Sequence, residues 1–228
     1  METVLITGAN RGIGLGLVKR YLGLGNCMLA VCRSPKNASQ LNSLSCDNLK
    51  VFEADVADDE MVARLAQTLA GQRIDILINN AGVIGGDQQS IDDMNYATWL
   101  NAFAVNTLAP FHMITALRKN LQLSKNARAI SISSQMGSLL RDGSPGYYAY
   151  RSSKAALNKV MQVLALELRG DGIIACPIHP GWVRTDMGGP QAEISVDESS
   201  GGIVKLIASL TMEHSGRFWT WDGREHPW

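Results

Sequence analysis

The chain has 228 residues, which is enough for one sizeable domain with a well-buried core. Its 21 basic and 21 acidic residues give no net charge. The chain therefore lacks the excess of basic residues that is typical of proteins that bind nucleic acid or acidic membranes. The four cysteines and four histidines show no metal-ligand spacing, and the first residues, METVLITGAN, lack the basic start of a signal peptide. We therefore expect a cytoplasmic, metal-free protein that binds small molecules and neither nucleic acid nor membrane.

Short β-rich runs alternate along the chain with stretches of helical periodicity. Several runs are apolar almost throughout, as expected of parallel strands covered on both faces. Two helical stretches end on Gly71 and Gly170, the residue type preferred just past a helix C-terminus. The sequence therefore predicts one doubly wound α/β domain over residues 1–228, with a mostly parallel sheet of seven strands. The expected strands cover residues 4–9, 27–33, 49–55, 74–82, 128–134, 173–181 and 217–223.

The first expected strand runs directly into TGANRGIG. Gly8, Gly12 and Gly14 come where this strand ends and lead into the helical residues 13–22. Glycine lets a backbone approach a phosphate closely, and a helix N-terminus offers free N–H groups and a partial positive charge. Tight turns use the same residues, so the phosphate interpretation depends on the strand, loop and helix occurring together. The spacing G-x3-G-x-G differs from the G-x-G-x-x-G of most dinucleotide sites.

Distinctive polar residues follow the later strands, at the edge where an open α/β sheet binds its ligands. Asp55 closes the third strand, and NNAG at residues 79–82 follows the fourth. Asn106 lies in VNTLAP, and Ser134 ends the SISS of the fifth strand. Each has a structural alternative: Asp55 as a helix N-cap, Ser134 as a strand end and Asn106 as a helix breaker.

The stretch YYAYRSSKAAL, residues 147–157, contains three tyrosines and then one lysine. Residues three or four apart share a helix face, and Tyr150 is the one tyrosine that lies four positions before Lys154. An ammonium beside a phenol lowers the phenol pKa from its ordinary value of about 10. That shift would suit Tyr150 for general acid–base catalysis. We expect Tyr147 and Tyr148 to flank the site at the start of the helix, with packing as their main role.

These motifs, with HPGWVRTDM after the sixth strand, resemble the classical short-chain dehydrogenases/reductases. The resemblance covers essentially the entire chain, and its landmarks occur in the family's order. The segments SISSQMGS, TDMGG and DGREHPW are more narrowly similar to the sniffer-type carbonyl reductases and C-factor-like proteins of that family.

The resemblance implies a Rossmann fold and hydride transfer between a nicotinamide cofactor and a carbonyl carbon. It makes Tyr150 the proton donor and Lys154 the residue that lowers the Tyr150 pKa and holds the nicotinamide ribose. Ser134 would polarise the carbonyl oxygen, and Asn106 would hold a water that links Lys154 to solvent. The family's cofactor contacts fall on Gly8, Asn10, Arg11, Gly12, Ile13, Gly14, Arg33, Asp55, Val56, Asn80, Ala81, Gly82, Tyr150, Lys154, Pro180, Gly181, Val183 and Thr185.

The basic residues near the glycine loop favour NADP(H) as the cofactor. NAD sites usually carry an acidic residue about 20 positions past the glycine loop, where NADP sites carry an arginine. Between Thr3 and Cys46 the sequence has no acidic residue, and Arg33 ends the second strand. A guanidinium binds a phosphate bidentately, and Arg11 adds a second one inside the glycine loop.

The sequence thus predicts an NADPH-dependent oxidoreductase that reduces the carbonyl of a small aldehyde, ketone or quinone-like molecule. One alternative is an NADP(H)-binding sensor or signalling protein of the C-factor type with little turnover. Another is an extended relative such as a sugar epimerase, which shares Tyr-x3-Lys but has a substrate domain that this chain lacks. The resemblance further implies a homodimer or homotetramer, and we expect residues 187–196 to form a small mobile cover over the nicotinamide.

Overall fold

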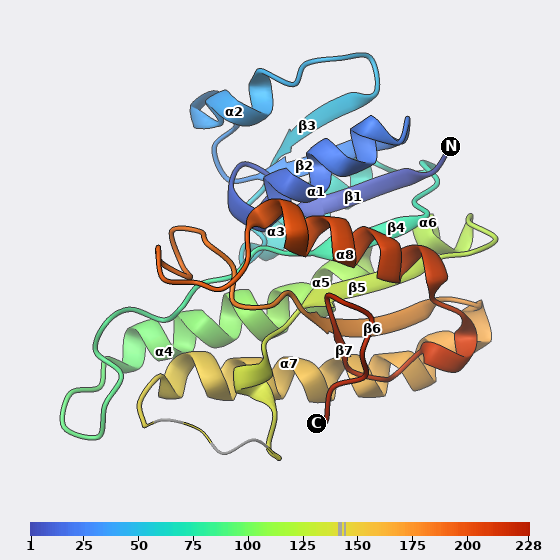
Figure 1. The fold of residues 1–228 in the computed structure, drawn as a ribbon. Helices are drawn as coiled ribbons and strands as arrows, with labels where there is room; N and C mark the ends of the chain where they lie inside the picture. The colour runs from blue at the N-terminus through green and yellow to red at the C-terminus, as the bar shows by residue number, and fades with distance from the viewer. Residues whose placement is uncertain (141–142, 144) are drawn as a thin grey trace.

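The fold is a seven-stranded sheet in which every neighbouring pair of strands is parallel (Figure 1). The computed structural model describes residues 1–140, 143 and 145–228, so part of the expected loop before Tyr147 lies outside the described residues. The strand order is β3-β2-β1-β4-β5-β6-β7. The strands are β1 (Thr3–Thr7), β2 (Cys27–Cys32), β3 (Leu49–Glu53), β4 (Ile76–Asn79), β5 (Arg128–Ile132), β6 (Ile174–His179) and β7 (Trp219–Thr220). The predicted doubly wound sheet is confirmed, and it is wholly instead of mostly parallel.

Helices cover both faces of the sheet. The α-helices are α1 (Gly12–Gly23), α2 (Ser39–Asn42), α3 (Asp59–Thr68), α4 (Tyr96–Phe103), α5 (Ala109–Ala116), α6 (Arg118–Gln122), α7 (Tyr148–Glu167) and α8 (Val196–Ser209). A π-helix, η2 (Ala104–Leu108), joins α4 to α5, and short 3-10 turns are η1 (Pro35–Asn37), η3 (Gln135–Gly137), η4 (Leu168–Asp171) and η5 (Met212–His214). Figure 1 shows α1 and α8 side by side across one face of the sheet.

The hydrophobic core has two parts, one on each face of the sheet. Successive strand side chains point to opposite faces of a sheet. Val4 and Ile6 of β1 pack with residues of α1 and α8, whereas Leu5 packs with residues of α3, α5 and α7. All three side chains are fully buried, which explains why this strand reads as a continuous apolar run.

Most of the strands are shorter than the sequence suggests, and they end where the polar motifs begin. The β4 ladder stops at Asn79 and the β5 ladder at Ile132, so residues 80–82 and Ser134 lie in connections beyond the sheet. The strand order reverses between the neighbours β1 and β4: β2 and β3 follow on the outer side of β1, and β5, β6 and β7 follow on the outer side of β4. Such a reversal of strand order opens a crevice beyond the carboxyl ends of the two strands.

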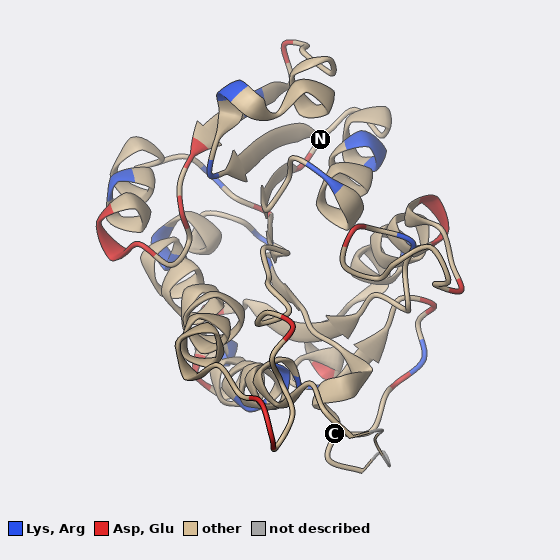
Figure 2. Cartoon of the chain, turned by 90° about the vertical axis from the view of Figure 1, so that its left-hand side faces the viewer, with Lys and Arg blue, Asp and Glu red and all other residues tan. Residues whose placement is uncertain are grey.

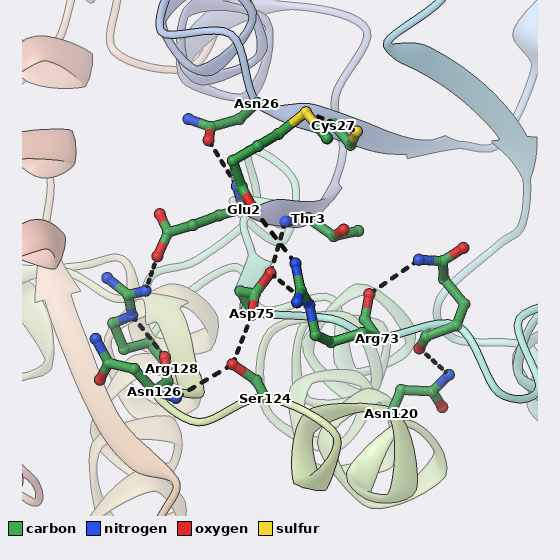
Figure 3. A network of polar contacts seen from close by, with 12 residues as sticks. Glu2, Thr3, Asn26, Cys27, Arg73, Asp75, Asn120, Ser124, Asn126 and Arg128 are labelled. Atoms are coloured by element: carbon green, nitrogen blue, oxygen red, sulfur yellow. Dashed lines mark hydrogen bonds and ion pairs between the residues drawn. The ribbon is translucent and has the colours of Figure 1, made fainter.

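A polar network fixes the opposite, amino-terminal edge of the sheet (Figure 3). Asp75 is 7% exposed and accepts hydrogen bonds from the Thr3 N–H at 2.8 Å and the Ser124 hydroxyl at 2.6 Å. Arg128, which begins β5, forms an ion pair with Glu2. Because buried charges are costly unless they are paired, these contacts hold the starts of β1, β4 and β5 in one arrangement.

Elsewhere, positively and negatively charged residues do not gather in separate regions of the molecule. In Figure 2, which views the molecule from the left-hand side of Figure 1, lysines and arginines are interspersed with aspartates and glutamates. Within the described part of the chain, no helix is long and apolar enough to cross a membrane.

Candidate active site

The loop between β1 and α1 leaves no room for a side chain at Gly8 or Gly14. Gly8 has a φ of +63°, and a Cβ there would lie 2.9 Å from the Cα of Ala81. A Cβ on Gly14 would lie 2.3 Å from the carbonyl oxygen of Gly8. The first turn of α1 carries no acidic residue, and no side chain caps its first N–H groups at the N-cap residue Arg11. This cradle fits an anionic group such as the pyrophosphate of a dinucleotide.

Thr7 and Asn80 join the ends of β1 and β4. The Asn80 side-chain amide donates to the carbonyl oxygens of Thr7 at 2.9 Å and Gly8 at 3.1 Å. The Thr7 hydroxyl accepts from the N–H groups of Asn80 at 3.0 Å and Ala81 at 3.1 Å. Four hydrogen bonds thus lock the two sides of the crevice together. The sequence analysis missed Thr7, whose one signal is its place directly before the first glycine of the loop.

Two of the predicted cofactor contacts, Asp55 and Val56, follow β3. Asp55 accepts from the N–H two residues further on, at 3.0 Å, which forms a tight turn. The N-cap of α3 is Asp58, so the alternative role of Asp55 as a helix cap is wrong. Val56 and Ala81 line one small hollow beside Thr7. The structure therefore brings residues at the ends of β1, β3 and β4 together around one hollow.

Two predicted phosphate-binding arginines lie exposed near the ends of β1 and β2. Arg33 directly follows β2. Arg11 precedes α1, and its guanidinium pairs with Asp186 at 2.6 Å. A Cβ on Gly12 would lie 3.4 Å from the Cγ2 of Thr185, so the segment after β6 packs against the glycine loop.

That segment, which begins at Pro180, folds back on itself. Gly181 has a φ of +85°, and a Cβ there would lie 2.5 Å from the Cδ1 of Ile194. The N–H of Arg184 donates to the carbonyl oxygen of Ile194 at 2.9 Å, and Val183 is buried. The bond between Arg184 and Ile194 closes this loop beside the glycine cradle, and Val196 already begins α8. The movement of residues 187–196 on ligand binding stays a prediction.

Helix α7 and the end of β5 bring together Ser134, Tyr150 and Lys154. Lys154 is 5% exposed, donates to the carbonyl oxygen of Ile132 at 2.7 Å and lies 5.8 Å from the centroid of the Tyr150 ring. Ser134 lies two residues past β5; its hydroxyl accepts from the N–H of Met136 at 3.1 Å and hydrogen-bonds to Tyr150. Ser134 therefore lies beyond the end of β5 and beside the phenol of Tyr150. Its role in catalysis stays a prediction.

Burial dominates the acid–base properties of this cluster. It raises the pKa of Tyr150 above the ordinary value, and the hydrogen bond from Ser134 opposes that rise. Burial also lowers the pKa of Lys154 to about 8. The expected lowering of the Tyr150 pKa by Lys154 is therefore not found, because the amino group lies over the ring and donates to a main-chain carbonyl.

Asn106 is fully buried in the π-helix between α4 and α5. Its Oδ1 accepts from the Val83 N–H at 2.9 Å, and its Nδ2 donates to the Val83 carbonyl at 2.8 Å and the Ser153 hydroxyl at 3.0 Å. The helix widens at Asn106 instead of breaking. A Cβ on Gly82 would lie 3.2 Å from Asn106 Oδ1 and 3.7 Å from Lys154 Nζ, so both polar atoms border one space. The water relay between them stays a prediction.

Tyr147 and Tyr148 lie at the start of α7, as expected, but both side chains are exposed, so the expectation that packing is their main role is wrong. Tyr147 has a φ of 57°, the one positive value among non-glycine residues in the described part of the chain. Such a conformation costs on the order of 1–3 kcal/mol and persists only where its surroundings enforce it. Strain is therefore stored three residues before Tyr150.

Comparisons with known proteins agree with this geometry. Residues 2–194 match the short chain dehydrogenase family, and the chain therefore belongs to that family. The protein named C-signal from Myxococcus xanthus is 41% identical over 155 residues, which cover 68% of this chain and 93% of the relative. The carbonyl reductase Sniffer of D. melanogaster has a TM-score of 0.95 at 32% identity, with both chains covered completely. A carbonyl reductase from chicken fatty liver, solved with NADPH bound, has a TM-score of 0.91 at 35% identity and covers 100% of this chain and 99% of its own.

These findings confirm the predicted resemblance to sniffer-type carbonyl reductases, and NADPH is the cofactor named for a solved relative. Among the described residues, histidine, cysteine, aspartate and glutamate side chains nowhere gather in groups of three that could hold a metal ion.

We expect Lys154→Met to change how stability depends on pH. The folded-state pKa of Lys154, about 8, lies below that of an unfolded lysine, so between these two values the unfolded state binds more protons. The free energy of unfolding of the wild type should rise with pH across that interval, relative to the variant, by up to about 1.4 kcal/mol per pH unit. Urea denaturation from pH 7 to pH 10 measures the difference.

The exposed Lys159 on the same helix provides the control, because Lys159→Met should leave the pH dependence unchanged. A difference between wild type and Lys154→Met that stays constant over the whole pH range would contradict the lowered pKa.

Proposed function

We propose that this chain is an NADPH-dependent carbonyl reductase acting on the aldehyde, ketone or quinone-like carbonyl of a small molecule. The observation that carries the proposal is the meeting of Ser134, Tyr150 and Lys154 beyond β5, at the same edge of the sheet as the glycine cradle. The solved relatives named as carbonyl reductases, one of them with NADPH, support both the reaction and the cofactor.

In this proposal the cofactor supplies a hydride to the carbonyl carbon, and the chain supplies a proton. Tyr150 donates its phenolic proton to the carbonyl oxygen, which Ser134 holds by a hydrogen bond as negative charge builds up. Because burial raises the pKa of Tyr150, the phenol is protonated at neutral pH and ready to act as the acid. Lys154, when protonated, stabilises the phenolate that remains, and Asn106 borders the route by which the proton is replaced.

We expect Tyr150→Phe to lower kcat for carbonyl reduction by at least about 100-fold, because it removes the proton donor and keeps the ring. Steady-state assays of NADPH oxidation measure the loss, and NADPH affinity, measured by fluorescence titration, should stay near that of the wild type. Tyr147→Phe and Tyr148→Phe are the matched controls and should keep most of the activity. Near-normal turnover by Tyr150→Phe would refute the mechanism.

Arg33→Ala tests the choice of cofactor. We expect NADPH affinity to fall about ten- to a hundredfold, because a charge-assisted phosphate hydrogen bond contributes roughly 1.5–3 kcal/mol, while NADH affinity changes little. Arg169→Ala is the control, since that exposed arginine follows α7 at the far end of the helix from Tyr150. If the wild type binds NADH as tightly as NADPH, the charge argument is wrong.

The relative named C-signal, at 41% identity, favours a second candidate function. In this candidate the chain binds NADP(H) and signals with little turnover. Both candidates bind NADPH, but only the first consumes it in the presence of carbonyl compounds. Binding of NADPH without reduction of any member of a broad panel of aldehydes, ketones and quinones would therefore favour the signalling candidate.

We also propose that the chain forms homodimers or homotetramers through the outer faces of α4, α5 and α7. Leu100, Leu108 and Phe111 are 73%, 60% and 45% exposed along α4, the π-helix and α5, and Val163 and Leu166 are exposed on α7. A row of large apolar side chains on neighbouring helices is typical of an interface.

Light scattering of the purified protein tests this assembly. We expect an oligomer for the wild type and a shift toward the monomer for Leu100→Glu/Phe111→Glu, because two charges would be buried in the interface. Leu24→Glu, at an exposed position after α1, should leave the mass unchanged. A monomeric wild type would contradict the proposal.

A further inference from the structure

We propose that Gln89 is a positioning residue for Tyr150: its buried side-chain amide caps the first turn of α7 and so fixes where the phenol lies relative to Ser134. Gln89 lies in the connection between β4 and α4, 61 residues before Tyr150. The inference rests on the proposed function, in which Tyr150 is the proton donor.

The start of α7 depends on a cap from outside the helix. The N-cap residue is Tyr147, which has left-handed backbone angles and makes no capping hydrogen bond with its side chain within the described structure. A helix normally satisfies its first N–H groups through a serine, threonine, aspartate or asparagine at this position. Here the N–H of Tyr150 donates to Oε1 of Gln89 at 3.2 Å. A distant glutamine thus performs the task of the missing local cap.

The other end of the Gln89 amide is held as firmly. Its Nε2 donates to the carbonyl oxygens of Ile84 at 2.8 Å and Gly86 at 2.7 Å. Both N–H groups of the amide are therefore used, which requires the oxygen to point toward the N–H of Tyr150. The residue is 6% exposed, so water competes little for these bonds.

The loop that carries Gln89 presses directly on α7. Gly85 has a φ of +93°, and a Cβ there would lie 2.8 Å from the Cβ of Ala149. At its beginning the same loop is fixed by the two hydrogen bonds between Val83 and Asn106. The loop is therefore fixed at Val83 and packed against α7 at Gly85, so a displacement of Gln89 would disturb the first turn of α7.

A closed series of hydrogen bonds surrounds the backbone of Tyr150. The Ser153 hydroxyl donates to the Tyr150 carbonyl at 2.8 Å and accepts from Asn106 at 3.0 Å. Asn106 in turn holds Val83, and the loop from Val83 returns to Gln89, which accepts from the Tyr150 N–H. Side chains of this series thus bond to both main-chain polar groups of Tyr150: Ser153 to its carbonyl oxygen and Gln89 to its N–H. The bond to Gln89 lies at the strained start of the helix.

The test separates positioning from support of the fold. We expect Gln89→Leu to lower kcat about ten- to a hundredfold, because small displacements of a reacting group have effects of this size. KM for the carbonyl and the dissociation constant of NADPH should stay within about twofold. Gln72→Leu is the matched control. The Nε2 of Gln72 also donates to a main-chain carbonyl, that of Arg73, at 3.1 Å, but Gln72 lies before β4 at the opposite edge of the sheet. It should retain full kcat.

Gln89→Glu provides the rescue and has nearly the shape of the native side chain. A protonated carboxyl can accept from the Tyr150 N–H and donate one bond to a loop carbonyl, whereas a carboxylate would face two carbonyl oxygens. Burial favours the neutral form. We therefore expect kcat of Gln89→Glu, relative to wild type at the same pH, to recover toward the native value as the pH is lowered.

Amide hydrogen exchange gives a readout that needs no turnover. The Tyr150 N–H should exchange at least about tenfold more slowly in the wild type than in Gln89→Leu or, if that variant does not fold, in Gln89→Glu at high pH. Equal exchange rates, or a folded Gln89→Leu with native kcat, would overturn the inference. If the wild type itself reduces no carbonyl, the proposed function fails, and the exchange rates still decide whether Gln89 fixes Tyr150.

Discussion

The joint between β1 and β4 is the constraint on which the rest of the site depends. These strands are neighbours in the sheet but far apart in sequence, and four hydrogen bonds between Thr7, Asn80 and the adjoining main chain hold their ends together. The glycines follow from that closeness: a Cβ on Gly8 or Gly14 would overlap the atoms that the joint brings near. The cradle is therefore a consequence of how closely two parallel strands meet at the point where the strand order reverses.

Electrostatics near β5 follow from the same burial that stabilises the domain. Lys154 comes from a helix packed across the sheet, so its amino group reaches the end of β5 from inside the protein and loses most of its hydration. Its lowered pKa and the raised pKa of Tyr150 have this single cause. Both shifts favour the uncharged forms of the two groups and move their pKa values apart, so that Lys154 gives up its proton more readily than Tyr150 does.

The sequence was sufficient for the fold and for the residues that approach the carboxyl edge. β-rich runs marked all seven strands, and several of them are apolar almost throughout because these parallel strands are covered on both faces. Spacing singled out Tyr150 because four residues make about one helical turn. The pKa of Tyr150 was predicted in the wrong direction, since sequence spacing shows that Lys154 is near but not that its amino group points at Ile132. Thr7 and Gln89 were missed for a related reason: each acts on a partner more than sixty residues away, and no local pattern marks such a partner.

The two edges of the sheet treat polar groups differently. At the amino-terminal edge, the buried Asp75 forms an ion pair with Arg73 and the buried Arg128 forms one with Glu2, an arrangement that serves stability. At the carboxyl edge, Lys154 is buried without such a carboxylate in the described structure, and Tyr147 keeps a strained backbone. Both features lower the stability of the fold, and both are tolerable only because neighbouring contacts hold them in place. Both destabilising features lie close to the phenol of Tyr150, which supports a catalytic role for this edge of the sheet.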